Sequence, residues 1–123
     1  TTLTIDFLGV DGRYLGGNIS LGCRTRTKAL ERYSKNLPLI DTPVSVQPEG
    51  TSLESSIGSG VVLGIIFEIE GYIKAHGENI VIFTGGDAIY FAKRMKSSIF
   101  VVCNLELMGL AIITDDYVKK IIG

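Results

Sequence analysis

A pair of glycines between a short apolar segment and a helical pattern is the feature of this sequence best suited to bind an anion. Thr84-Gly85-Gly86-Asp87 follows the β-branched run 79–84, which predicts a buried strand, and precedes a helix expected over 88–95. Open α/β sheets bind ligands beyond the carboxyl ends of their strands, and the start of a helix offers N–H groups to an anion. A tight turn capped by Asp87, without any ligand, fits the same residues.

Hydroxyl side chains at two other places could contact a polar group. Gly50-Thr51-Ser52 precedes the longest predicted helix, where the hydroxyls could hold a polar substrate or a phosphate, although a plain N-cap by Thr51 or Ser52 is the favoured interpretation. Thr1-Thr2-Leu3-Thr4 opens the chain in a predicted strand, with Thr1 on the face opposite Thr2 and Thr4. Ordinary strand threonines are the favoured interpretation there.

Several kinds of chemistry find no support in the residue pattern. The single histidine, His76, stands in a turn-like segment and is expected at the surface. The two cysteines, Cys23 and Cys103, form no CxxC motif and are expected to be free thiols in a reducing cytoplasm. No Ser-His-Asp, Cys-His or HExxH arrangement can be assembled, and no general base stands out among the scattered carboxylates. We therefore predict no metal site and no catalytic residue within this chain.

The composition is that of one soluble globular domain. The chain has 123 residues, 46% of them hydrophobic and 20% charged, with a formal net charge of −1. This balance argues against a nucleic-acid partner or an anionic membrane partner. The longest apolar run, 61–67, contains Gly64, is stopped by Glu68, and is too short to span a bilayer.

The order of predicted elements indicates an α/β layer fold, with a mixed sheet and flanking helices. A β-hairpin is expected over 1–21 around the turn signal Asp11-Gly12. After it we expect, in order, a helix over 24–35, an extended connection over 39–50, a helix over 52–75, a strand over 79–84, a helix over 88–95, a strand over 98–102, and helices over 105–113 and 116–122.

The long helix carries two rows of residues at helical spacing. One row is apolar and predicts a ridge that faces the core: Leu53, Ile57, Val61, Ile65, Ile69 and Ile73. The other row is small, with Ser56, Gly60 and Gly64. Because glycine costs about 1 kcal/mol against alanine inside a helix, this row predicts close approach of another helix or of a second subunit.

Taken in order, several segments resemble type III pantothenate kinases. The opening Thr-Thr-Leu-Thr-Ile-Asp resembles the tail of their Asp-x-Gly-Thr-Ala-x-Thr-x-Asp segment. Further matches follow along nearly the whole chain: 13–22 with their Gly-Gly-x-Ile-x-Pro-Gly strand, 29–38 with their next helix and its stop, 50–60 with their Gly-x-Ser/Asn-Thr segment, 68–73, and 84–88. Leu21 stands in place of the family proline.

The resemblance implies a fold and an activity. Members have two RNase H-like domains of the actin-like ATPase superfamily, with ATP between them. They transfer the γ-phosphate of ATP to pantothenate, giving 4'-phosphopantothenate in the first step of coenzyme A biosynthesis. The resemblance further implies Mg²⁺, a monovalent cation (K⁺ or NH₄⁺), a homodimer and a cytoplasmic location.

The resemblance also implies roles for particular residues. Thr1 matches a threonine that contacts an ATP phosphate, and Gly85 and Gly86 match glycines on the adenosine side. Leu53 stands where the family carries a threonine that contacts pantothenate, so either Ser52 or the backbone at Leu53 is expected to supply that contact.

The family's catalytic aspartate, its cation-binding aspartate and its first nucleotide-binding loop find no match in this sequence. We therefore expect residues 1–123 to be the C-terminal RNase H-like domain of a two-domain kinase, without the N-terminal domain and the first strand of this domain. Such a chain would be inactive alone. The alternative is a non-catalytic actin-like module that binds nucleotide, regulates a partner or dimerises; Leu53 favours it.

Overall fold

The computed structural model describes residues 1–77 and 80–102. The chain groups into two compact units: a first unit of Thr1–Ile5 with Asn18–Ala75, and a second unit of Asp6–Gly17 with His76–Gly123. The helices predicted over 105–113 and 116–122 lie outside the described residues, as does Cys103.

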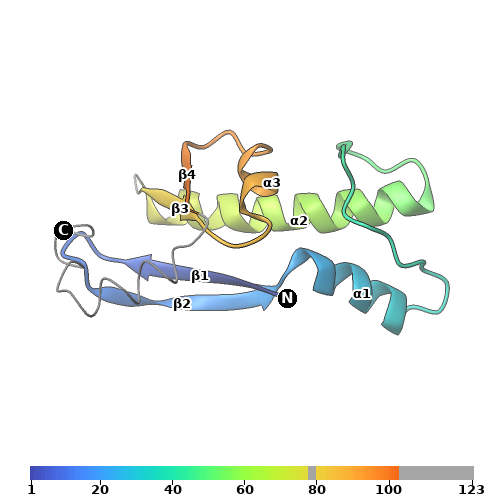
Figure 1. Cartoon of the computed structure of the whole chain (residues 1–123), viewed down its shortest axis with the longest axis horizontal. Helices are drawn as coiled ribbons and strands as arrows, with labels where there is room; N and C mark the ends of the chain where they lie inside the picture. The colour runs from blue at the N-terminus through green and yellow to red at the C-terminus, as the bar shows by residue number, and fades with distance from the viewer. Residues whose placement is uncertain (78–79, 103–123) are drawn as a thin grey trace. The chain divides into compact units, whose positions relative to one another are not determined.

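The chain begins with the predicted hairpin. Strands β1 (Thr2–Leu8) and β2 (Tyr14–Leu21) run in opposite directions and form a two-stranded sheet (Figure 1). The Gly9 N–H donates to the Arg13 carbonyl at 2.8 Å, and the Gly12 N–H donates to the Gly9 carbonyl at 2.9 Å. Gly12 has a φ of 79°, which glycine adopts without steric cost. The turn predicted at Asp11-Gly12 is therefore confirmed.

Two helices follow the hairpin, both close to their predicted positions (Figure 1). Helix α1 (Cys23–Tyr33) begins directly after β2, and helix α2 (Leu53–His76) begins after a connection without regular structure. Helix α2 is followed by Gly77 with a φ of 73°, the conformation that commonly ends a helix. The predicted closure of the long helix at His76-Gly77 is confirmed.

The apolar row of α2 supplies much of the buried core of the first unit. Four members of the predicted ridge are buried: Ile57, Val61, Ile65 and Ile69. Their neighbours Val62 and Ile66 are buried as well, which widens the stripe. Leu53 is 53% exposed, so its prediction as a core residue is wrong. It is the first residue of the helix and lies ahead of the buried part of the stripe.

Among the described residues, only Ser56 of the small-residue row of α2 meets another backbone: a Cβ added at Gly50 would lie 2.3 Å from the Ser56 Cα. A Cβ atom added at Gly60 would meet nothing within 4 Å, and one added at Gly64 would meet only the Arg26 side chain. A further close approach falls on Gly58, where an added Cβ would lie 3.1 Å from Pro43 Cγ. Within the described part of the chain the predicted approach is thus found at Ser56 but not at Gly60 or Gly64, and contact with a second subunit stays a prediction. The crowded face lies under the 39–50 connection, which carries no periodic signal.

Helix α2 is also long and apolar enough, by length and composition alone, to cross a membrane. Its most apolar window has a mean hydropathy of 1.4, and 44% of that window is buried inside the structure. Core helices of soluble proteins meet the same criterion. The run 61–67 alone is too short for this criterion, which is met only over a longer part of the helix that includes Glu68 and Glu70.

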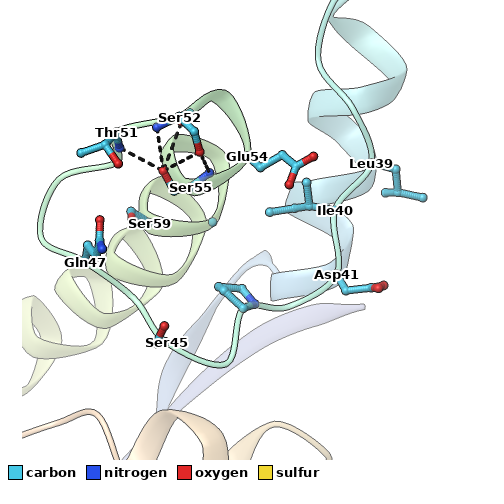
Figure 2. A pocket seen from close by; sticks show the side chains of 12 residues that line it. Leu39, Ile40, Asp41, Ser45, Gln47, Thr51, Ser52, Glu54, Ser55 and Ser59 are labelled. Atoms are coloured by element: carbon cyan, nitrogen blue, oxygen red, sulfur yellow. Dashed lines mark hydrogen bonds between the residues drawn. The ribbon is translucent and has the colours of Figure 1, made fainter.

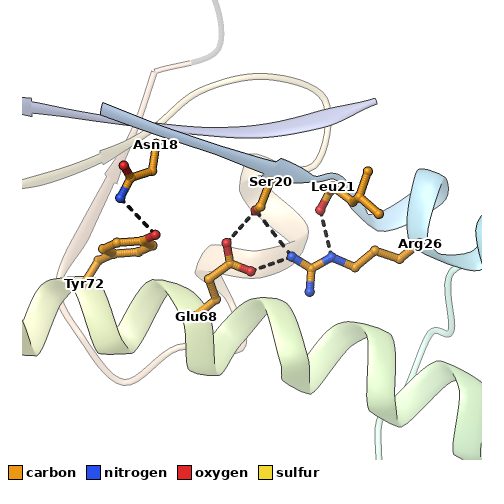
Figure 3. Close-up of polar contacts among 6 residues, drawn as sticks. All are labelled: Asn18, Ser20, Leu21, Arg26, Glu68 and Tyr72. Carbon is orange, nitrogen blue, oxygen red and sulfur yellow. Dashed lines mark hydrogen bonds and ion pairs between the residues drawn. The ribbon is translucent and has the colours of Figure 1, made fainter. Parts of the chain in front are cut away.

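Polar contacts join the end of β2 to both helices in the first unit (Figure 3). Glu68 on α2 accepts hydrogen bonds from Ser20 and from Arg26, whose Nη2 also forms an ion pair with it at 2.5 Å. The Arg26 Nε donates to the Leu21 carbonyl at 2.7 Å. We name these four residues, Ser20, Leu21, Arg26 and Glu68, the Arg26 clamp. Farther along, Asn18 donates to the Tyr72 hydroxyl at 3.0 Å.

The Arg26 clamp lowers the pKa of Glu68 below its usual 4.5. Partial burial by itself raises the pKa of this carboxyl. The hydrogen bond from Ser20, the hydrogen bond from Arg26 and the charge of Arg26 all act in the opposite direction, and together they outweigh burial. The carboxylate is therefore the favoured form in the folded chain.

The described part of the second unit contains a parallel strand pair and a short helix. Strand β3 (Val81–Phe83) pairs with β4 (Ile99–Val101), with Val81 opposite Ile99, and helix α3 (Ala88–Ala92) lies between them in sequence. Ala88, Phe91 and Met95 form the buried positions of this segment. The strands occur where predicted, although both are shorter.

The predicted burial of the strand over 79–84 is wrong. Ile82 in β3 is 49% exposed, and Phe100 in its partner strand β4 is 62% exposed. Among the described residues each of these strands pairs only with the other, which leaves a face uncovered. Within the described residues the strands form two two-stranded sheets, and the α/β class is confirmed.

His76 belongs to the second unit and is exposed, as predicted. Its ring stacks on Phe7, with 4.1 Å between the ring centroids and 10° between the planes. In the same unit the Tyr14 hydroxyl donates to Asp6 Oδ1 at 2.9 Å, and this hydrogen bond raises the pKa of Tyr14.

Candidate functional site

A polar pocket of about 530 Å³ lies beside the start of α2 in the first unit (Figure 2). One side is formed by the connection between the helices and the other by the first turns of α2. The lining residues are Leu39, Ile40, Asp41, Pro43, Ser45, Gln47, Thr51, Ser52, Glu54, Ser55, Gly58 and Ser59. Hydroxyl and amide groups dominate this lining.

Ser52 and Ser55 cap the start of α2 reciprocally (Figure 2). The Ser55 N–H donates to Ser52 Oγ at 3.1 Å, and the Ser52 N–H donates to Ser55 Oγ at 2.9 Å. The Thr51 N–H donates to the same Ser55 oxygen, also at 2.9 Å. This is the geometry of a capping box with serine in the third helical position. The interpretation of Ser52 as an N-cap is confirmed.

Close backbone approach at Gly50 fixes the path of the chain into the pocket wall. A Cβ atom added at Gly50 would lie 2.3 Å from the Cα of Ser56 and 2.4 Å from its nitrogen. No L-residue with a side chain fits there without a shift of the backbone. Gly50 therefore lets the segment before the cap fold directly against the first turn of α2.

The charges that line the pocket are both negative. Asp41 and Glu54 are the charged lining residues, and the lining includes no lysine or arginine. In Figure 2 the Asp41 carboxylate points away from the Ser52–Ser55 pair. Hydroxyl, amide or cationic groups of a ligand fit such a lining better than a carboxylate or phosphate does.

The structure treats the two predicted substrate residues differently. Ser52 lines the pocket, whereas Leu53 is absent from the lining and is exposed beside it. The residues on the opposite wall, such as Ser45 and Gln47, were predicted only as part of an extended connection. Nothing in their spacing indicates a site, because they reach the pocket through the path of the loop.

Thr1, predicted to contact a phosphate, is held by the start of α1. Its carbonyl oxygen accepts hydrogen bonds from the Gly22 N–H at 3.0 Å and from Thr25 Oγ1 at 2.6 Å. A Cβ atom added at Gly22 would lie 2.9 Å from the Thr1 carbonyl carbon. The beginning of β1 is therefore fixed by two donors, while Thr1 itself is exposed.

Gly85 and Gly86, predicted to bind the nucleoside, form the turn between β3 and α3 in the second unit. Gly85 has a φ of 97°, and its carbonyl accepts a hydrogen bond from the Ala88 N–H at 3.3 Å. A Cβ added at either glycine would meet no described residue within 4 Å. The tight turn is confirmed. Asp87 is the N-cap residue, but its side chain forms no capping hydrogen bond, so that part of the prediction is wrong.

Thr1 and the two glycines belong to different units. Within residues 1–77 and 80–102, no group of three or more His, Cys, Asp and Glu residues is placed to hold a metal ion.

The architecture matches a solved α/β structure. A crystal structure of a Campylobacter jejuni protein, described as a conserved Baf family transcriptional activator, superposes with a TM-score of 0.74 at 24% identity. The match covers 94% of this chain and 53% of that one. At this identity the similarity establishes the fold alone.

Sequence comparison identifies the family. The family model described as type III pantothenate kinase matches residues 1–75, and the chain belongs to this family. A type III pantothenate kinase of Azobacteroides pseudotrichonymphae is 44% identical over 113 residues, and one of Flavobacterium psychrophilum is 44% identical over 114 residues. These matches cover 89% of this chain, but only 46% and 47% of the relatives. The chain thus spans about half the length of the curated relatives that it matches.

Proposed function

We propose that the native protein that contains this chain phosphorylates pantothenate with ATP, giving 4'-phosphopantothenate in the first step of coenzyme A biosynthesis. The observation that carries the proposal is the family match over residues 1–75, which include the hairpin, α1 and α2. We further propose that the chain is the C-terminal RNase H-like domain of an actin-like, two-domain kinase in the cytoplasm.

In this proposal the nucleotide is bound at two places. Thr1 contacts a phosphate, and Gly85 and Gly86 accommodate the adenosine side. The open space around both glycines supports this role, because no atom of residues 1–77 and 80–102 occupies the position of a side chain there. Mg²⁺ and a monovalent cation, K⁺ or NH₄⁺, would neutralise phosphate charge, since phosphoryl transfer depends mainly on positioning and electrostatics.

The pocket beside α2 is our candidate for the pantothenate site. Pantothenate carries two hydroxyls, an amide and a terminal carboxylate. The hydroxyl and amide groups match Ser52, Ser55 and Gln47, whereas the carboxylate is disfavoured by Asp41 and Glu54. We therefore orient the hydroxyl end of the substrate toward the Ser52–Ser55 cap. The general base is assigned to the part of the relatives that this chain does not cover.

The test is an assay of ADP release by the purified native gene product. We expect release that requires pantothenate, Mg²⁺ and K⁺ or NH₄⁺ together, with residues 1–123 alone as the inactive control. Absence of pantothenate-dependent ADP release from the native protein would overturn the assignment.

We also propose a homodimer that uses the exposed face of α2. Gly60 offers an open position on this helix, and Phe67 is 63% exposed. A bulky side chain at Gly60 should therefore block a partner helix. We expect Gly60→Leu to shift the native protein from dimer to monomer in light scattering, whereas Arg24→Leu on α1 should leave the dimer intact. A dimer that survives Gly60→Leu contradicts this interface.

The second candidate is a non-catalytic actin-like module for nucleotide binding, regulation or dimerisation. The observation in its favour is Leu53, an apolar and exposed residue beside the pocket. Such a module would bind ATP in calorimetry yet show no turnover at any pantothenate concentration. The ADP-release assay therefore separates the two candidates directly.

A further inference from the structure

We propose that Thr25 is a positioning residue that orients the backbone of Thr1 toward the phosphates of ATP. In this proposal the Arg26 clamp stabilises the junction between β2 and α1, on which Thr1 lies. This inference rests on the proposed function, because it presumes that Thr1 contacts ATP. It adds a role for residues on α1 and α2 that do not themselves touch the nucleotide.

The first step is the hydrogen bonding of the Thr1 carbonyl. It accepts 2.6 Å and 3.0 Å hydrogen bonds from Thr25 Oγ1 and from the Gly22 N–H. Because the peptide unit is planar, a carbonyl held at one orientation also fixes the rotation of the backbone after Thr1. Without these two donors an exposed residue such as Thr1 would keep more of its backbone freedom.

The second step is the close approach of the two segments. An added Cβ at Gly22 would lie 3.0 Å from the Thr1 carbonyl oxygen and 3.1 Å from the Thr2 nitrogen. Gly22 is buried and stands immediately before α1. The missing side chain lets the first residue of the sequence lie directly on the junction between β2 and α1.

The third step is the support of that junction by α2. Arg26 Nε donates to the carbonyl of Leu21, the residue immediately before Gly22. The guanidinium of Arg26 is in turn held by Glu68, which lies 42 residues away in the sequence (Figure 3). A chain of contacts therefore connects the Thr1 carbonyl to α2: Gly22 binds this carbonyl, and Arg26 binds both Leu21 and Glu68.

The experiment compares Thr25→Val, Thr25→Ser and Thr27→Val in the native gene product. Valine keeps the shape of threonine but removes the donor, and serine restores it. Thr27 is the matched control, because its hydroxyl donates to the Arg24 carbonyl within α1 instead of to the Thr1 carbonyl. Arg26→Lys is a further variant, since lysine keeps the charge but cannot donate from a guanidinium Nε to Leu21.

For Thr25→Val we expect the KM for ATP to rise about fivefold to tenfold, the effect of losing one hydrogen bond. The KM for pantothenate should stay unchanged, and the thermal unfolding midpoint should fall no further than in Thr27→Val, which also loses one hydrogen bond. Thr25→Ser should restore the KM for ATP to within about twofold, and Thr27→Val should leave it unchanged. Arg26→Lys should raise it in the same direction as Thr25→Val.

An unchanged KM for ATP in Thr25→Val, or an equal rise in Thr27→Val, would overturn the inference. If Thr25→Val does not fold, the test rests on Arg26→Lys, with Thr25→Ser expected to keep the KM for ATP within about twofold. An unchanged KM for ATP in Arg26→Lys then overturns the inference. If the native protein shows no pantothenate-dependent turnover, the proposed function fails separately. The dissociation constant of ATP, measured by calorimetry on the same variants, then tests the positioning role by itself.

Discussion

The guanidinium of Arg26 on α1 forms an ion pair with the carboxylate of Glu68 on α2, at 2.5 Å. Their side chains are 21% and 23% exposed, so the pair is only partly screened by water. Both groups have further partners at the end of β2, namely Leu21 for Arg26 and Ser20 for Glu68. This pair is therefore the point at which three elements of the first unit are joined.

We expect Glu68→Gln to lower the free energy of unfolding by about 1 kcal/mol at neutral pH, because the amide keeps acceptor geometry but loses the charge. Urea denaturation measures this difference. Glu70→Gln on the same helix is the control, since Glu70 forms no ion pair among the described residues. An equal loss in both variants would show that the pairing with Arg26 contributes nothing specific.

The same ion pair predicts a pH dependence. The pKa of Glu68 is lowered in the folded chain, so its contribution to stability is complete above the unfolded-state value of 4.5. The contribution is lost as the pH falls through the lower, folded-state pKa. The stability difference between the native sequence and Glu68→Gln should thus stay constant above about pH 5 and shrink as the pH falls further. A difference that stays constant down to about pH 3 contradicts the assignment.

Ser52 has both a capping role and a proposed substrate role, and two variants separate them. Ser52→Ala should cost about 1 kcal/mol of unfolding free energy, because the N–H of Ser55 loses its acceptor. Ser52→Asn should recover most of that stability, since asparagine also caps helices well.

A substrate contact by the Ser52 hydroxyl would raise the KM for pantothenate in both variants, while the KM for ATP stays constant. If Ser52→Asn restores the KM for pantothenate together with stability, the hydroxyl acts only as a cap.

Two glycines near the start of α2 should respond to alanine in opposite directions. Gly50→Ala places a Cβ within 2.3 Å of the Ser56 backbone and should destabilise the chain by roughly 1–3 kcal/mol. Gly60→Ala meets no described residue within 4 Å and should stabilise the helix by up to about 1 kcal/mol. Thermal unfolding of both variants gives the comparison; a stabilised Gly50→Ala would refute the close approach.

Leu53→Thr tests whether the residue type at this position limits substrate binding. Leu53 is the first residue of α2 and is exposed beside the pocket, so the change should fold normally. We expect a severalfold lower KM for pantothenate if a hydroxyl here contacts the substrate, on the scale of one hydrogen bond. An unchanged KM for pantothenate would mean that Ser52 or the backbone already provides the contact.

The elements with a strong local pattern were predicted correctly. Helix α2 was found from its i, i+4 apolar row, and the hairpin turn from Asp11-Gly12, because both signals arise from neighbours in sequence. The exposure of Leu53 was missed, since periodicity does not show where a helix enters the core. The predicted burial of β3 was wrong for a similar reason: the apolar composition of a strand does not show whether other strands or helices cover it.

The candidate site was predicted only in part. Ser52 could be predicted because a hydroxyl residue just before a helical pattern commonly caps the helix, and this role depends only on neighbours in the sequence. The opposite wall of the pocket depends on the path of the 39–50 connection over Gly58, which is a tertiary contact without a sequence signature. The link from Glu68 through Arg26 toward Thr1 was missed as well, because it joins residues 42 positions apart.

Helix α2 runs without interruption from the pocket cap at Ser52 to the attachment of Glu68 and beyond. Loss of the cap should therefore destabilise more of α2 than its first turn, because the same continuous helix contacts β2 through Glu68. Amide protons on the buried side of this helix, such as those of Val62 and Ile65, should exchange with solvent as one cooperative block. Substrate binding at one end would then slow opening at the other.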